Sequence, residues 1–318
     1  MARTRRGSPI GALLLAVSAC ASPAVDPSPA GPAAHAEGLV PIADDRSIWV
    51  RCAGTGSPTV VLIAGKGNGA ADWLDILAPD DPVRDAPGDD LPLGMGSIVP
   101  SDDAVFPSVA RFTRVCAYDR PDIRVGAEVT TPRAQPHTVD ADVDDLHAML
   151  DALGESGPYV LVAHSYGGLI ADLFARTHPH DVSGLVMLDA ATAQIAHDVR
   201  AEQLVAWDAS NALTSEQVHE GVRLLDAFDR IAAAGPLPDV PAAVLSADKP
   251  WRTDLLPPEV AAVDTVTFED WARAQVRLAL ELGVEQVAET GSGHDIGLYQ
   301  PALVVRTIRA VVDEVRAG

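Results

Sequence analysis

The segment 159-YVLVAHSYGGLIADLFA-175 joins an apolar run to a helical pattern, and its single serine, Ser165, lies at the junction. Residues 159–164 have the composition of a buried strand, and from residue 167 onward the apolar residues group on one helix face. Small residues stand two positions before and two positions after the serine. A sharp strand-to-helix turn needs small residues there, because the two backbones nearly touch. Such a turn would expose the Ser165 hydroxyl at a helix N-terminus, where backbone N–H groups favour an anion.

Short apolar runs alternate with helical patterns along most of the chain, which indicates an α/β fold with a mostly parallel central sheet flanked by helices. We expect strands at residues 47–52, 59–63, 113–118, 159–164, 184–188 and 242–246, and a weaker one at 284–288. The turn cluster AGTGSP at 53–58 predicts that the first two of these strands pair as a hairpin.

Two segments interrupt this alternation. Residues 75–107 are rich in Asp, Pro and Gly and are expected to form a long irregular insertion. Residues 191–241 have a helical pattern with apolar positions, and we expect them to form a small helical cap.

The pattern A-x-S-x-G in a strand–turn–helix setting resembles the nucleophile elbow of the α/β-hydrolase superfamily, with Ala163 in place of the usual first glycine. The resemblance covers nearly all of residues 41–318, which we treat as one domain. It implies an α/β-hydrolase fold in which Ser165 is the nucleophile. The competing interpretation is an ordinary turn built from small residues.

A serine needs an adjacent base, and nine histidines are candidates. His294 lies in the Gly-rich segment GSGHD between the last expected strand and the last helix, and this resembles the superfamily's C-terminal G-x-G-H signature. The resemblance implies that His294 is the general base. His164 adjoins Ser165 but should point the opposite way along its strand, so we expect it to pack or to support a loop. His178 and His180 lie in the polar turn RTHPHD.

The catalytic acid should follow the serine and precede the histidine along the chain, and two residues are candidates. Asp189 follows the strand-like run LVML, whereas Asp248 follows AAVLSA, with Asp254 further along. The acid most often follows the later strand in the superfamily, but haloalkane dehalogenases carry it at the earlier position. We favour Asp189 and keep Asp248 as the alternative. Asp189 also suits the cap of a following helix.

An oxyanion hole requires two donors. The resemblance implies the backbone N–H of Tyr166 and, in the loop LIAGKGNG, the backbone N–H of Lys66 or of Gly67. The Lys66 side chain is expected to point to solvent. The segment CAYDRPD at 116–122 contains Asp119 and Arg120. The resemblance implies that these two residues brace the oxyanion loop and the nucleophile turn.

The N-terminus indicates export. Residues 1–19 combine basic residues with a short apolar stretch typical of a signal peptide, and VSAC at 17–20 resembles a lipoprotein box in which Cys20 is acylated. Residues 20–40 are Pro/Ala-rich and indicate a disordered spacer. We expect anchorage at the outer face of a bacterial cell membrane or location in the periplasm. The alternative is an ordinary signal peptide cut nearby, with Cys20 incidental.

The two remaining cysteines are an even number in an oxidising compartment. Cys52 and Cys116 lie in strand-like segments that are neighbours in the implied architecture, so a disulfide between them is expected. The alternative is two buried thiols.

The charge balance restricts the partners. Asp and Glu number 45 against 23 Lys and Arg, giving a net charge of −22, which argues against nucleic acid and against electrostatic binding to anionic lipid. Any membrane contact should therefore come through a lipid anchor alone. No H-x-x-x-H or similar cluster appears, so neither a metal site nor a cofactor is expected.

These features predict a serine hydrolase that cleaves carboxylic esters with an apolar acyl group. A perhydrolase would use the same three residues, and a non-enzymatic binding lipoprotein is the alternative from another class. Epoxide hydrolase and dehalogenase activities are disfavoured, because those enzymes carry Asp where Ser165 stands.

Overall fold

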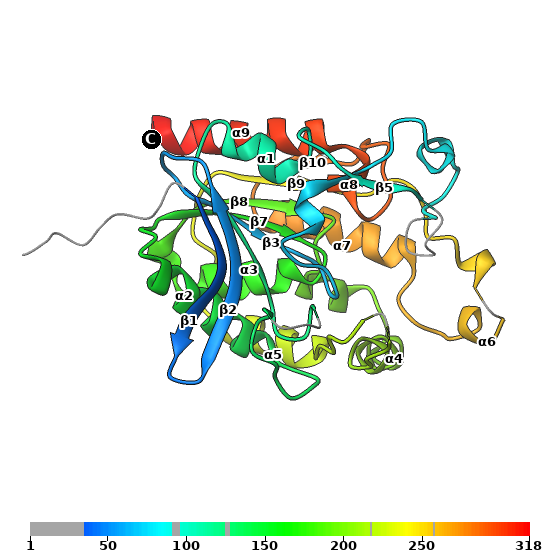
Figure 1. Ribbon diagram of the computed structural model, residues 1–318. Coiled ribbons are helices and arrows are strands. Elements are labelled where there is room, and N and C mark those ends of the chain that lie inside the picture. The colour runs from blue at the N-terminus through cyan, green and yellow to red at the C-terminus, as the bar shows by residue number, and fades with distance from the viewer. Residues whose placement is uncertain (1–34, 91–95, 125–127, 217, 257) are drawn as a thin grey trace, which may run out of the picture. The chain divides into compact units, whose positions relative to one another are not determined.

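The computed structural model describes residues 35–90, 96–124, 128–216, 218–256 and 258–318 (Figure 1). The predicted signal peptide, the predicted lipidation site at Cys20 and residues 20–34 of the predicted spacer lie outside the described residues. Within the described ranges, no helix combines the length and the apolar character needed to cross a membrane.

The core of the described chain is a mixed sheet of eight strands in the order β1-β2-β6-β3-β7-β8-β9-β10. The strands are β1 (Ala36–Ala43), β2 (Arg46–Ala53), β3 (Val60–Ile63), β6 (Val115–Asp119), β7 (Tyr159–His164), β8 (Val182–Leu188), β9 (Ala242–Leu245) and β10 (Gln286–Val287). The β1–β2 and β2–β6 pairs are antiparallel and the other pairs are parallel. The predicted α/β class with a mostly parallel sheet is confirmed.

Two details of the predicted sheet are wrong. Strand β1 begins at Ala36, so the ordered domain starts earlier than residue 41, and residues 36–40 are not part of a spacer. The predicted hairpin between β2 and β3 does not form, because β6 lies between them and pairs with both. The turn at 53–58 instead carries the chain past the start of β6, and β2 forms its hairpin with β1.

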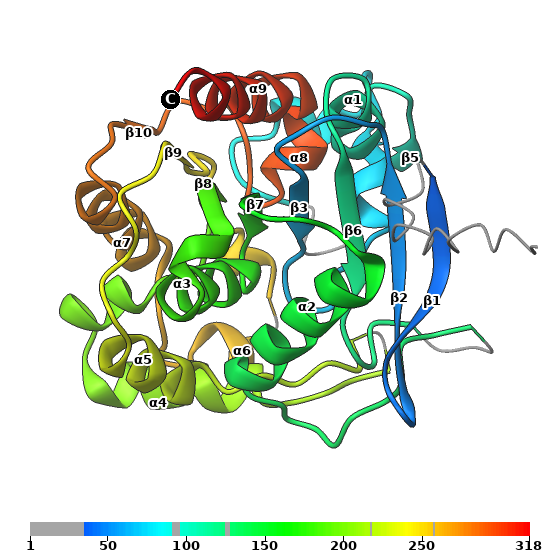
Figure 2. The same ribbon diagram turned by 90° about the vertical axis from the view of Figure 1, so that its left-hand side faces the viewer.

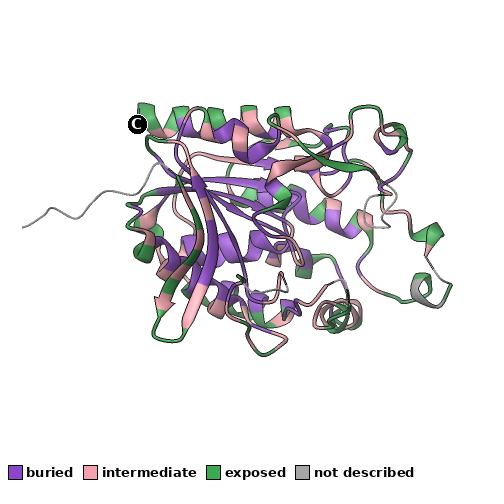
Figure 3. Ribbon diagram, viewed as in Figure 1, coloured by how far each residue is buried: buried purple, intermediate pink, exposed green. Residues whose placement is uncertain are grey.

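Helices cover both faces of the sheet, with α2 and α3 on one face and α1 and α9 on the other (Figure 2). Apart from α4, which is given below, the described helices of six or more residues are α1 (Val105–Ala110), α2 (Val139–Leu153), α3 (Gly167–Thr177), α5 (Leu224–Ala233), α7 (Phe268–Glu281) and α9 (Pro301–Ala317). Each face of the sheet has its own hydrophobic core, and successive residues of β3 point into one core and then the other. Val61 packs with α2 and α3, whereas Val60 and Leu62 pack with α1 and α9. A strand covered on both faces must be apolar throughout, and the central strands are buried accordingly (Figure 3).

The insertion after β3 is more regular than its composition suggests. It contains a two-stranded antiparallel sheet of β4 (Asp75–Leu77) and β5 (Ile98–Pro100), with the short helix η1 (Asp72–Leu74) just before β4 and η2 (Pro82–Asp85) between the two strands. The predicted cap region contains η5 (Ala193–His197), α4 (Ala201–Asn211) and α5, so its helical pattern is present in the structure. The remaining short helices are η4 (Pro179–Asp181), η6 (Thr253–Leu255), α6 (Pro258–Ala261) and α8 (Ile296–Tyr299).

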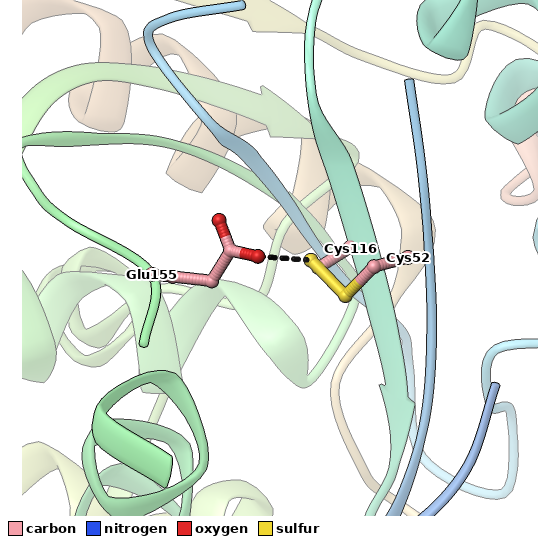
Figure 4. Close-up of side chains that lie close together, drawn as sticks. All are labelled: Cys52, Cys116 and Glu155. Carbon is pink, nitrogen blue, oxygen red and sulfur yellow. Dashed lines mark hydrogen bonds between the residues drawn. A yellow bond between two sulfur atoms is a disulfide. The ribbon is translucent and has the colours of Figure 1, made fainter. Parts of the chain in front are cut away.

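A disulfide links β2 to β6. Cys52 and Cys116 lie directly opposite one another in the register of the two strands, and their sulfurs are bonded. The buried carboxylate of Glu155 points toward this bond, with Oε1 3.8 Å from the Cys116 sulfur (Figure 4). The same oxygen accepts a hydrogen bond from the Arg114 guanidinium at 2.7 Å. The predicted pairing is therefore confirmed.

Candidate active site

Ser165 lies on a sharp turn between β7, which ends at His164, and α3, which begins at Gly167. Its φ of 51° is in the left-handed region, which non-glycine residues rarely occupy. The surrounding backbone holds this conformation: the Ser165 carbonyl accepts hydrogen bonds from the N–H groups of Gly168 and Ala191, both at 2.8 Å. Strain of this kind is kept only where neighbouring contacts fix it, and it is common at functional sites.

The glycine two positions after Ser165 is required by a neighbouring strand. A Cβ at Gly167 would lie 2.4 Å from the Ile63 carbonyl oxygen and 2.9 Å from that of Ala64. The sequence correctly predicted a small residue here, but the crowding comes from the end of β3 and not from the serine's own strand. Any side chain at this position would push α3 away from the sheet.

His294 and Asp189 are brought into direct contact. The Nδ1 atom of His294 lies 2.6 Å from Asp189 Oδ2. Asp189 is fully buried directly after β8, and its other oxygen accepts a hydrogen bond from the Ala247 N–H at 3.0 Å. Asp189 does not cap the next helix, because Thr192 does so for η5. His294 and Ser165 line the same cavity of about 300 Å³.

Asp248 has a different environment from Asp189. It is exposed, and its two carboxylate oxygens accept hydrogen bonds from the backbone N–H groups of Gly291 and Ser292 at 2.9 and 2.8 Å. Asp248 therefore braces the start of the loop that carries His294, without contacting the imidazole in the described structure.

Asp89, in the insertion after β3, supports the same loop and was not singled out from the sequence. Its Oδ2 accepts a hydrogen bond from the His294 backbone N–H at 2.8 Å, and its Oδ1 accepts one from the Tyr299 hydroxyl at 3.1 Å. A Cβ at Gly293 would lie 2.2 Å from the Asp89 carboxylate, so this approach requires glycine. Burial raises the pKa of Asp89. No sequence signal separates Asp89 from the other acids of its segment.

His164 also contacts the His294 loop. Its Nε2–H donates to the His294 carbonyl oxygen over 3.0 Å, and the two rings are 4.7 Å apart. The expected loop-supporting role agrees with this contact.

The loop after β3 reaches the serine. A Cβ at Gly65 would be only 2.9 Å from the Ser165 Cβ. The N–H of Gly67 already donates to a Glu220 carboxylate oxygen at 2.7 Å, so it is not free to serve an oxyanion. The backbone N–H groups of Lys66 and Tyr166 have no acceptor within the described part of the chain. Of the two candidates in this loop, the geometry therefore favours Lys66.

The Lys66 side chain is partly exposed and contacts the predicted cap. Its ammonium group donates to the Leu213 carbonyl oxygen in the cap region at 3.2 Å. The stem is partly buried, and this burial lowers the pKa of Lys66.

Comparison with known proteins agrees with this geometry. Residues 104–238, less than half of the chain, match the family model for the alpha/beta hydrolase fold. The protein has the α/β-hydrolase fold. The matched segment includes Ser165 and Asp189 and ends before His294.

Solved α/β-hydrolase structures resemble the chain over most of its length. One is Est816, described as an N-acyl homoserine lactone degrading enzyme, with a TM-score of 0.52, 17% identity, and coverage of 86% of this chain and 100% of that one. Another is a membrane phospholipase A, with a TM-score of 0.52, 17% identity, and coverage of 90% and 88%. At this identity the likeness concerns the fold alone.

Curated relatives match shorter segments. Lipase LipV of Mycobacterium tuberculosis is 46% identical over 70 residues, which are 22% of this chain and 26% of the relative. Protein YqjL of Bacillus subtilis is 29% identical over 143 residues, or 45% of this chain and 44% of the relative. An uncharacterised Schizosaccharomyces pombe protein is 37% identical over 94 residues, or 30% and 17%. The chain spans less than half the length of each of these relatives.

A buried polar network lies beneath the turn that carries Ser165. We call it the Glu220 network, and its members are Arg120, His137, Asp142, Tyr166 and Glu220. Arg120 Nε donates to Glu220 Oε1 at 2.7 Å, while His137 Nε2 lies 3.4 Å from the same oxygen. His137 Nδ1 is 3.0 Å from Asp142 Oδ2, which also accepts from the Tyr166 hydroxyl at 2.6 Å. All five residues are buried.

The charges in the network depend on one another. Burial lowers the pKa of His137, but hydrogen bonds and charges from Asp142 and Glu220 outweigh it and raise that pKa to about 9. Burial raises the pKa of Glu220, but Arg120 and His137 outweigh it and lower that pKa to about 2. At neutral pH the network therefore holds Arg120, His137 and Glu220 in their charged forms.

The network also fixes the loop after β3. The two terminal nitrogens of Arg120 donate to the carbonyl oxygens of Ala64 and Gly65 at 2.8 and 2.6 Å. Glu220 holds Arg120 from the other side and also accepts from the Gly67 N–H. Glu220 belongs to the segment predicted as the cap, so a cap residue sets the backbone from which Lys66 presents its N–H.

We expect Glu220→Gln to lower the free energy of unfolding by about 3 kcal/mol, because it removes the counter-charge of a buried Arg120 while keeping the side-chain volume. Urea unfolding at pH 7 measures the change. The matched control is Glu202→Gln, an exposed cap residue, which should change the free energy by less than about 0.5 kcal/mol. Equal free energies of unfolding for the two variants would show that the Glu220 charge does not stabilise the fold.

The pH dependence of catalysis should follow His294. Burial lowers the pKa of His294, but the hydrogen bond and charge of Asp189 outweigh this and raise it to about 9. Only the neutral imidazole accepts a proton, so kcat/KM should rise with pH and reach half its maximum well above pH 7. Initial rates of ester hydrolysis from pH 5.5 to 10, corrected for spontaneous hydrolysis, test this expectation. A profile already flat from pH 6.5 would contradict it.

Proposed function

We propose that the protein is a serine hydrolase that cleaves carboxylic esters, with Ser165 as nucleophile, His294 as general base and Asp189 as the orienting acid. The observation that carries the proposal is the 2.6 Å contact between His294 Nδ1 and Asp189, on an imidazole that shares a cavity with Ser165. The segment shared with Lipase LipV supports the same class of reaction.

The reaction would follow the double-displacement route of serine hydrolases. The Ser165 hydroxyl attacks the ester carbonyl while its proton passes to His294 Nε2, and Asp189 stabilises the resulting imidazolium. The N–H groups of Lys66 and Tyr166 stabilise the oxyanion. The imidazolium then protonates the departing alcohol, leaving an acyl-enzyme on Ser165. Water, deprotonated by His294, attacks the acyl-enzyme, the bond between the acyl carbon and Ser165 Oγ breaks, and His294 returns the proton to Ser165 as the acid is released.

The cavity suits a compact apolar substrate group. Trp207, Trp251 and Trp271 line it together with Leu256. Trp271 packs edge-on against Trp207 at 5.9 Å and lies 6.0 Å from Trp251, which holds the aromatic wall in place. A volume of about 300 Å³ is at the low end for ligand pockets. We infer a preference for short and medium acyl chains.

A series of p-nitrophenyl esters tests this function. We expect kcat/KM to be highest for acyl chains of about four to eight carbons and to fall for chains of about sixteen, because the cavity volume is limited. Labelling by a fluorophosphonate probe should accompany the activity. A folded protein that hydrolyses none of the esters and is not labelled would instead be a binding protein on a hydrolase scaffold.

A further inference from the structure

A second cluster of imidazoles lies at the C-terminal end of α3, whereas Ser165 precedes the N-terminal end of this helix. His147 is on α2, His178 directly follows α3, and Asp181 ends η4. The two imidazole rings are stacked, with centroids 4.4 Å apart, and all three residues are partly exposed. One donor atom from each of the three residues lies within 4.8 Å of the others.

The distances in this cluster are longer than hydrogen bonds. Asp181 Oδ2 is 3.8 Å from His147 Nε2 and 4.0 Å from His178 Nδ1. An N–H···O hydrogen bond would bring these atoms to ~2.7–3.2 Å. Two ligands bound to one tetrahedral zinc ion with bonds of ~2.0–2.1 Å are ~3.4 Å apart. Moving the Asp181 oxygen about half an ångström closer to each nitrogen would give it this spacing. The donor atoms of the two imidazoles lie within 4.8 Å of each other, and the stacked rings would turn so that both lone pairs face the ion.

Metal-bound histidines commonly have a carboxylate near their second ring nitrogen, and His147 has such a neighbour. His147 Nδ1 lies 3.5 Å from Asp151 Oδ2, one helical turn along α2. A carboxylate on that side favours the proton on Nδ1 and leaves Nε2, which lies 3.8 Å from Asp181 Oδ2, as the ligand atom.

We propose that His147, His178 and Asp181 form a binding site for a divalent transition-metal ion, zinc in particular. Two imidazoles and one carboxylate match zinc, whereas Ca²⁺ and Mg²⁺ require oxygen ligands. A bound ion would tie α2 to the end of α3, the helix whose opposite end follows Ser165. The sequence alone did not suggest the site, because its ligands come from three elements and have no metal-binding spacing.

The other clustered set of this kind in the described residues, Cys52, Cys116 and Glu155, does not qualify. Its two sulfurs are bonded to each other and are not thiolates (Figure 4).

Titration of the full-length, tag-free protein with ZnCl₂ tests the proposal by calorimetry and by thermal unfolding. We expect one equivalent to bind with micromolar or tighter affinity, and a saturating concentration near one hundred times Kd to raise Tm by at least ~5 °C. Substitution of CoCl₂ should give visible d–d bands of a site with nitrogen ligands. Absence of zinc binding by the wild-type protein would overturn the proposal.

Variants separate this cluster from other donors, such as the imidazoles near Ser165. His178→Gln and Asp181→Asn should each lose one equivalent of zinc and the rise in Tm, while His180→Gln, in the same turn, should keep both. Circular dichroism without metal checks that each variant is folded. The cobalt spectrum of the wild-type protein tests the site without the use of any variant. Zinc binding unchanged in a folded His178→Gln variant would place the ion elsewhere and reject the site.

Discussion

Replacing Ser165 by alanine will reduce kcat/KM for p-nitrophenyl butyrate by at least about 10⁴-fold, because no other group can form the acyl-enzyme. The side chain faces the cavity and its backbone is held through the Ser165 carbonyl, which alanine keeps. The fold should therefore survive, with Tm nearly unchanged. Initial rates and fluorophosphonate labelling measure the loss, and labelling should disappear.

The control for this variant is Ser156→Ala, an exposed serine in the turn before β7. It should retain full activity and full labelling. A Ser165→Ala protein that keeps more than about a tenth of the wild-type activity would remove this serine from the mechanism and leave the proposed function without its nucleophile.

The second large effect concerns the acid. Asp189→Asn should lower kcat/KM by about 10³- to 10⁴-fold with little change in KM, because an amide at this position favours the wrong tautomer of His294. Asparagine tolerates the left-handed backbone at residue 189, where φ is 40°, so the site should keep its shape. Steady-state kinetics at several pH values measure the change.

Asp248→Asn provides the matched comparison. In the part of the chain that the structure describes, its carboxylate accepts hydrogen bonds from the backbone N–H groups of Gly291 and Ser292 alone, and an amide oxygen can still accept one of them. We expect a loss of less than about tenfold. The opposite ranking of the two variants would assign the acid to Asp248.

The parts of the fold that follow from local pattern could be predicted from the sequence. The junction at Ser165 combines a long apolar strand with a helical face, and both periodicities are present within seventeen residues. The Cys52–Cys116 bond followed from two strands that are neighbours in the sheet. Strand β1 was missed, because an edge strand alternates half-buried and exposed residues and its first residues lie in a Pro/Ala-rich region.

The supporting carboxylates could not be predicted. Asp89 and Glu220 are two acids among 45, and neither lies in a motif. Each becomes distinctive only because the tertiary structure buries it against a loop of the site, where it binds a backbone N–H of His294 or of Gly67. The hairpin was mispredicted for a related reason, since the turn at 53–58 does not specify which strand will lie beside β2.

The buried carboxylate of Glu220 has a practical consequence for engineering. Exchanging the predicted cap for that of a homologue is an obvious way to alter substrate range, and in this protein such a chimera would also remove the carboxylate that neutralises Arg120. A donor cap lacking an acid at the equivalent place would leave an arginine buried without its neutralising partner. Successful chimeras of this protein should therefore retain residue 220 or exchange it together with Arg120.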